Sequence, residues 1–145
     1  MRDSQRSKFY SWEDSFIIKL IPDYNSPLCY DDCVALMQRV CNKHKIPMPL
    51  VKITRKDSGK SYYRCMDHSV NLSIYGHRYG VVLHEIAHAI ACKTKPDDGG
   101  HGEYFVGIYC ELMGRMFDIS IEYLMAQAKK YGLKSTRLNC QEGTL

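Results

Sequence analysis

Residues 81–90 read Val-Val-Leu-His-Glu-Ile-Ala-His-Ala-Ile and contain the pattern His-Glu-x-x-His at His84, Glu85 and His88. A helix advances about 100° and 1.5 Å per residue, so the two histidines would lie on one face, roughly 6 Å apart. Imidazoles at that spacing can bind one zinc ion at about 2.1 Å, with the carboxylate of Glu85 beside the position left for water. The stretch therefore predicts a metal-binding helix.

The residues that flank this pattern strengthen the prediction. Apart from His84, Glu85 and His88, all residues from 81 to 91 are uncharged, and most are aliphatic. Burying two histidines and a glutamate in such a helix is costly unless something compensates them. A bound cation would do so, whereas the alternative is a core helix whose histidines are only hydrogen-bonded. The apolar flanks favour the cation.

Composition is that of an ordinary globular protein. The chain has 145 residues, 45% of them hydrophobic and 25% charged, which predicts a single domain over 1–145. A net charge of +4 permits contact with nucleic acid or an acidic partner without requiring it. Two loose basic groups are more typical of solvated faces, so nucleic-acid binding has weak support; they are Arg55, Lys56, Lys60 and Arg64, and Lys129, Lys130, Lys134 and Arg137.

Location is predicted from two features of the sequence. Residues 1–15 contain no apolar core of a signal peptide, and no apolar run is long enough to span a membrane. Seven cysteines without a Cys-x-x-Cys pair suggest mostly reduced, buried thiols rather than a structural zinc or a disulfide set. We expect a cytoplasmic protein with no membrane partner.

Periodicity predicts an α+β domain. We expect a helix over about 31–45, strands at 50–54, 61–65 and 69–74, the metal-binding helix at 79–92, a loop at 95–100, and helices at 101–117 and 119–131. The first two strands would form a hairpin through a turn at 57–60. The ends of the chain, 1–15 and 133–145, are expected to be loosely ordered.

The third zinc ligand should follow the loop. Candidates are Asp97, Asp98, His101, Glu103 and Glu111. His101 is favoured because it begins the apolar stripe of the next helix, with Phe105, Ile108, Leu112 and Met116. Glu103 would point away, about 200° round that helix. Glu111 remains an alternative, either as a ligand or as a group that orients a histidine.

These residues resemble the SprT-like zincins, the family that includes Spartan-type proteases. The resemblance covers about residues 69–117 and rests on two motifs, His-Glu-Ile-Ala-His at 84–88 and Gly-His-Gly-Glu-Tyr-Phe at 100–105. It implies a zincin-like fold with an N-terminal helix, a three-stranded antiparallel or mixed sheet, the metal helix and C-terminal helices. It also implies one Zn²⁺ ion on His84, His88 and His101, with Glu85 as general base.

The resemblance extends to the strand before the metal helix. In zincins an equivalent edge strand pairs with an extended peptide, which assigns substrate binding here to Asn71, Leu72 and Ser73. Larger family members carry a Cys-rich zinc ribbon after the protease domain. The spacing of that ribbon is not found in these 145 residues, so we expect a minimal version of the domain.

The expected function is hydrolysis of peptide bonds in a protein or peptide substrate. Glu85 would take the proton of the attacking water and pass it to the leaving amine. Tyr104, Tyr75 or His77 could stabilise the oxyanion, and the sequence does not choose between them. The alternative is a zinc-containing binding module that lacks proteolytic activity, with nucleic acid as a candidate partner.

Overall fold

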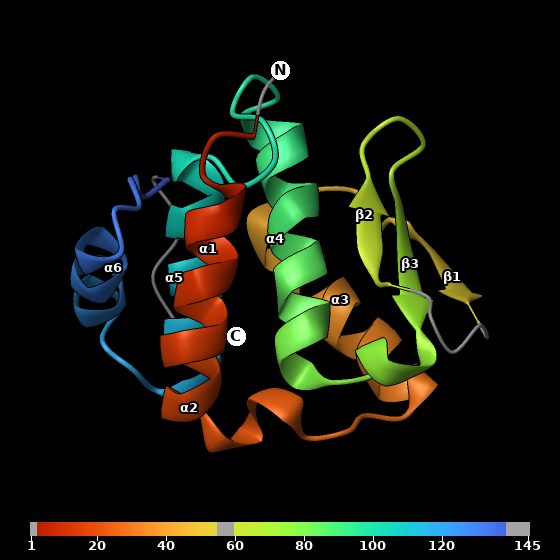
Figure 1. Ribbon diagram of the computed structural model, residues 1–145. Coiled ribbons are helices and arrows are strands. Elements are labelled where there is room, and N and C mark those ends of the chain that lie inside the picture. Colours follow the sequence, from red (N-terminus) through yellow and green to blue (C-terminus); the bar gives the residue numbers. More distant parts are fainter. Residues whose placement is uncertain (1–2, 55–59, 139–145) are drawn as a thin grey trace.

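The structure is a computed structural model that describes residues 3–54 and 60–138 (Figure 1). In chain order its elements are α1 (Arg6–Trp12), the π-helical turn η1 (Glu13–Ile17), α2 (Ile18–Leu20), the 3-10 turn η2 (Pro22–Asn25), α3 (Tyr30–His44), β1 (Leu50–Thr54), β2 (Tyr62–Arg64), β3 (Ser69–Ser73), the 3-10 turn η3 (Ile74–Gly76), α4 (Tyr79–Thr94), α5 (Glu103–Phe117) and α6 (Ile121–Lys130). The α+β class expected from the sequence is confirmed.

Helix α4 carries the His-Glu-x-x-His pattern through the middle of the fold. It contacts α5 on one side, α3 on another, and the strands β2 and β3 on a third. Figure 1 shows the sheet on one side of α4, with α5 and α6 on the other. Ten of its sixteen residues are buried, which explains why its sequence is apolar on nearly every face.

The sheet differs from the hairpin that the sequence predicts. Its strand order is β1-β3-β2, with β1 parallel to β3 and β2 antiparallel to β3. The tight turn therefore connects β2 to β3, and residues 57–59 of the predicted turn lie outside the described residues. Residues of β3 are uncharged and all buried, whereas β1 contains Lys52 and β2 contains Arg64. Charged strands suit the edges of a sheet, so β3 takes the centre.

This topology corrects the predicted substrate strand. Asn71 pairs with Lys52 of β1 and with Tyr62 of β2, so β3 is hydrogen-bonded along both edges. The backbone amide of Ser73 also donates to the Ser61 hydroxyl at 3.0 Å. Asn71 thus offers no open edge to a peptide, whereas Leu72 and Ser73 lie beyond the ladder with β2 and pair with β1 alone. The edge strand beside α4 is β2 (Figure 1).

The N-terminal region is helical rather than loosely ordered. Residues 6–20 form the continuous rod α1-η1-α2, which lies beside α4 and α5 (Figure 1). Phe9, Trp12 and Ile17 are fully buried on it. The polar residues between these apolar ones are the reason that the sequence suggested a loosely ordered segment. One face of the rod nevertheless packs into the hydrophobic core.

Residues 133–138 are also bonded to the rest of the domain, without forming a helix or strand. The backbone amide of Lys134 donates to the Gln5 side chain at 2.7 Å, and that of Thr136 donates to the Glu103 carbonyl at 2.9 Å. Leu133 is buried. The expectation of a loose C-terminal segment is therefore wrong for 133–138, while 139–145 lies outside the described residues.

One pair of cysteines departs from the expected reduced state. Cys65, just after β2, and Cys92 on α4 form a disulfide across 27 residues of sequence. Cys29, Cys33, Cys41 and Cys110 are free, and all but Cys29 are buried, as expected. Sequence spacing alone did not reveal the pair, because the fold brings the β2–β3 turn onto α4.

No helix in the described part of the chain is both long and apolar enough to cross a membrane.

Candidate metal centre

His84, His88 and His101 form a cluster that could bind a metal ion. One ring nitrogen from each residue lies within 4.8 Å of the other two. His84 and His88 come from α4 at the predicted helical spacing, and His101 comes from the loop that leads into α5. The structure thus brings together the three residues that the sequence and the resemblance singled out.

Glu13 orients the His84 ring through a contact with its Nδ1 atom. Its Oε2 atom lies 2.9 Å from Nδ1 of His84 and accepts hydrogen bonds from the hydroxyls of Tyr24 at 2.6 Å and Tyr109 at 2.8 Å. An ionised carboxylate only accepts, so Nδ1 of His84 carries the proton and its Nε2 lone pair faces the cluster. Outer partners of this kind fix the tautomer of metal-binding histidines.

Local backbone features place that carboxylate. Glu13 begins the π-helical turn η1, and π-helical turns occur often at functional sites. Gly80 opens α4 opposite Tyr24, and a Cβ atom there would overlap the Tyr24 ring. The absence of a side chain at Gly80 therefore lets the Tyr24 hydroxyl reach Glu13.

Asp3 orients His101 in the same way. Its Oδ2 atom lies 2.7 Å from Nδ1 of His101, and its Oδ1 atom accepts the backbone amide of the same residue at 3.1 Å. Gly100 has a φ of +54°, and a Cβ atom there would overlap the Asp3 carboxylate. Glycine at this position thus allows both the left-handed backbone and the close approach of Asp3.

His88 is positioned by a ring and a backbone group. Its imidazole stacks on Phe105, with ring centroids 4.1 Å apart, and is hydrogen-bonded to the Gly100 backbone. His84 and His101 thus have a carboxylate acceptor at Nδ1, and His88 has a backbone acceptor.

Burial and neighbouring charges shift the pKa values of the three histidines in different directions. Burial, together with the nearby charges of His84 and His101, holds the pKa of His88 well below its usual value. Burial also lowers the pKa of His101, although Asp3 opposes this. For His84 the effect of burial is outweighed by the hydrogen bond and charge of Glu13, so its pKa is raised. Burial alone would raise the pKa of Glu13, but His84, Tyr24 and Tyr109 lower it.

The residues present fit a metal ion. Nε2 of His101 is buried and has no hydrogen-bond partner among the described residues. A buried imidazole nitrogen without a partner is costly, and a cation at the centre of the cluster would satisfy it. Three imidazole nitrogens within 4.8 Å of one another, with Nδ1 of His84 and of His101 bonded to carboxylates, are a donor set that suits zinc.

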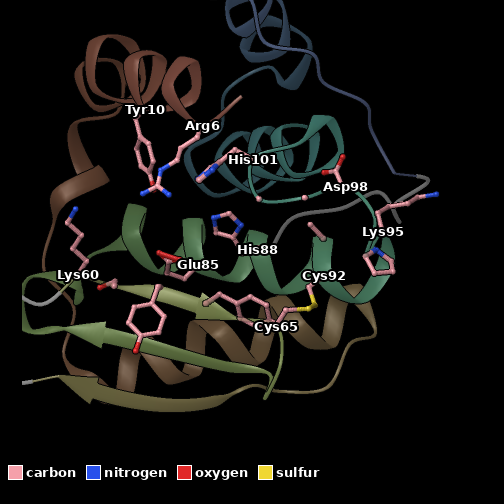
Figure 2. Close-up of a pocket in the computed structure, with 17 residues that line it drawn as sticks. Arg6, Tyr10, Lys60, Cys65, Glu85, His88, Cys92, Lys95, Asp98 and His101 are labelled. Carbon is pink, nitrogen blue, oxygen red and sulfur yellow. A yellow bond between two sulfur atoms is a disulfide. The ribbon is translucent and has the colours of Figure 1, made fainter. Parts of the chain in front are cut away.

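Glu85 lies next to the cluster at the bottom of a cleft. The cleft has a volume of about 460 Å³ and is lined by Glu85, His88 and His101, among others. Figure 2 shows Tyr10 and Arg6 of α1 on one side of it and Glu85 of α4 on the other. Burial, with a smaller effect of the charge of Glu13, raises the pKa of Glu85, while His84 and a hydrogen bond from the Tyr63 backbone oppose the shift.

The three predicted oxyanion donors lie outside this cleft. Tyr104 lines a different hollow, where the Lys95 ammonium lies 4.8 Å from its ring centroid. Tyr75 is 57% exposed on η3. The His77 ring lies beside Tyr30, with ring centroids 6.4 Å apart. None of the three contributes to the lining of the cleft in the described structure.

The remaining acidic candidates have other partners. Glu111 is buried on α5 and accepts a hydrogen bond from Arg137 at 2.7 Å. Asp98 accepts the backbone amide of Phe105 at 2.9 Å near the start of α5, and Glu103 accepts the Thr136 hydroxyl at 2.8 Å. Asp97 is exposed in the loop.

Sequence reasoning missed Asp3, which precedes the N-terminal rod, and Tyr10 and Glu13, which lie on it. The cleft is lined by Tyr10, and the other two bind the histidines. One available signal was the spacing of Phe9, Trp12, Phe16 and Leu20, which repeats every three or four residues and predicts a helix with a buried face.

No protein-family model, no curated protein and no solved structure matches the chain.

Proposed function

We propose that this protein is a zinc-dependent metallopeptidase that uses its site in the manner of the SprT-like zincins. The observation that supports this most strongly is the cluster of His84, His88 and His101, in which Nε2 of His101 is buried without a partner. Glu85 lies beside the cluster in an open cleft, where a structural metal site would not need a carboxylate. A cleft also allows a substrate to approach, as a catalytic site requires.

Each residue has a separate task in this proposal. His84, His88 and His101 would hold the ion, and Glu13 and Asp3 would keep the rings in the required tautomer. Zinc, when bound, would polarise the scissile carbonyl and acidify a water molecule. Glu85 would accept the proton of the attacking water and deliver it to the leaving amine.

An extended substrate would lie along β2. Residues 60–63 line the cleft, and β2 pairs with β3 only on its other edge. Main-chain pairing with an exposed strand gives affinity that depends little on sequence. In this proposal the β2 edge takes the role that the resemblance to zincins implied for Asn71, Leu72 and Ser73.

The test compares the wild type with Glu85→Gln. Both proteins are purified, their zinc is counted by elemental analysis, and each is incubated with heat-denatured β-casein, with products identified by mass spectrometry. We expect one zinc ion per chain in both proteins and cleavage by the wild type alone. Glu122→Gln, on exposed α6, is the matched control and should cleave as the wild type does.

Two results would contradict the proposal. If the wild type binds zinc but cleaves no substrate, with or without DNA, a zinc-containing binding module becomes the better account. Absence of any transition metal from a folded wild-type protein would exclude both functions.

A further inference from the structure

The wall of the cleft opposite Glu85 contains Tyr10. Its side chain extends from α1 into the space above Glu85 (Figure 2), and it lines the cleft together with Glu85, His88 and His101. The Tyr10 ring centroid lies 5.0 Å from that of His101 and 6.0 Å from that of His84. Tyr10 thus lies against two of the three residues that would hold the metal.

The Tyr10 hydroxyl differs from those of the other tyrosines near the site. Tyr24 and Tyr109 donate to Glu13, and Tyr63 is hydrogen-bonded to Nδ1 of His68. No hydrogen bond involves the Tyr10 hydroxyl within residues 3–54 and 60–138. The side chain is 38% exposed, so the open cleft can supply a partner.

The ring itself is held in place while the hydroxyl stays available. It stacks on His84 with an interplanar angle of 15°, and the Arg6 guanidinium carbon lies 5.9 Å from its centroid. A donor fixed before the reaction stabilises developing charge more effectively than one that must reorganise.

We propose that Tyr10 is a catalytic residue whose hydroxyl donates a hydrogen bond to the oxyanion that forms when a peptide carbonyl is attacked. This inference rests on the proposed peptidase function. The phenol stays protonated throughout, the carbonyl π electrons move to oxygen as the water oxygen bonds to carbon, and Glu85 receives the water proton. Tyr10 and Glu85 lie across the cleft from each other (Figure 2), so a peptide bound between them would have the donor and the base on opposite sides of its scissile bond.

Tyr10→Phe tests the inference because it removes only the hydroxyl and keeps the ring. The zinc-loaded proteins are titrated calorimetrically with acetohydroxamate. Its carbonyl oxygen and its anionic N–O oxygen would occupy the place of the reacting carbonyl and water, and its binding needs no catalysis. Because Tyr10→Phe removes a hydrogen bond to a charged group, we expect it to lower the affinity for acetohydroxamate roughly 10- to 100-fold. On casein, kcat should fall about 10²- to 10³-fold with little change in KM.

The control is Tyr123→Phe, a tyrosine of α6 that is 43% exposed and does not line the cleft. It should leave acetohydroxamate affinity, zinc content and casein cleavage unchanged. The inference is overturned if Tyr10→Phe binds one zinc ion and binds acetohydroxamate as tightly as the wild type. If the wild type cleaves no casein, the peptidase function fails, and the acetohydroxamate comparison still decides whether Tyr10 is a donor in the site.

Discussion

The Oε2 atom of Glu13 lies 2.9 Å from Nδ1 of His84, although 71 residues separate them in the chain. This contact connects the N-terminal rod to the His-Glu-x-x-His helix at the point where a metal would bind. Asp3 makes the equivalent contact to His101 across 98 residues. Residues 3–13 therefore help to build the site that α4 and the loop before α5 contain.

Glu13→Gln should weaken zinc binding by about 10- to 100-fold. The amide keeps the shape of the side chain, but it presents a neutral acceptor and an extra donor to three groups that now donate to the carboxylate. Competition with a chromogenic chelator measures the affinity. Asp14→Asn makes the same change of charge at an exposed neighbour, and it should bind zinc normally. Equal affinity in the two variants would refute the role given to Glu13.

Asp3→Asn should also lower zinc affinity, by a factor in the same range of about 10 to 100. The asparagine can still accept the His101 backbone amide through its oxygen, but its NH₂ group cannot accept from Nδ1. The same chelator assay applies, with the exposed Asp31→Asn as control. If Asp3→Asn behaves like the control, His101 does not depend on this orienting contact.

Loss of the Cys65–Cys92 disulfide should destabilise the fold. The cross-link joins positions 27 residues apart, and a loop of that length corresponds to about 3–4 kcal/mol of unfolding free energy in the chain-entropy account. The double variant Cys65→Ser/Cys92→Ser is compared with the wild type by urea denaturation without reductant. Cys29→Ser, at an exposed free thiol, should change little. A double variant as stable as the wild type would show that the bond does not constrain the unfolded chain.

Two buried thiols should remain protonated in moderately alkaline solution. Burial raises the pKa of both Cys33 and Cys41 from the ordinary value of 9.0 to about 11. At pH 8 iodoacetamide should therefore modify exposed Cys29 well before either of them, as peptide mass spectrometry can measure. Rapid labelling of Cys33 or Cys41 in the folded protein would contradict their burial.

The same two pKa shifts predict how stability depends on pH. Because the folded state holds these thiol protons more tightly than the unfolded state, their contribution is fully present below about pH 9. It is lost as the pH rises through about 11. Urea denaturation should show a lower midpoint at pH 10.5 than at pH 8. The substitution Cys41→Ala should make the difference between these two midpoints smaller.

The elements with strong periodicity could be predicted from the sequence. The metal-binding helix was expected at 79–92 and is found at Tyr79–Thr94, and the helix expected at 31–45 is found at Tyr30–His44. His84, His88 and His101 could be predicted to meet because they lie within 18 residues, on one helix and on the loop that leads into the next. Local spacing determines such contacts.

Features that depend on distant pairing could not be predicted. The strand order β1-β3-β2 depends on which strand the helices bury, and the Cys65–Cys92 bond depends on that order. Glu13 and Asp3 reach their histidines only because the N-terminal rod and the residues just before it pack over α4 and α5. A single sequence contains no local signal for contacts across 71 or 98 residues.

Crystallography of the zinc-loaded protein tests the central claim most directly. Diffraction data collected on either side of the zinc absorption edge would locate the metal through its anomalous signal. We predict one strong peak in contact with ring nitrogens of His84, His88 and His101, with Glu85 beside it and Glu111 away from it. A zinc-loaded crystal with no peak between those three histidines, or with its peak on other residues, would contradict the account.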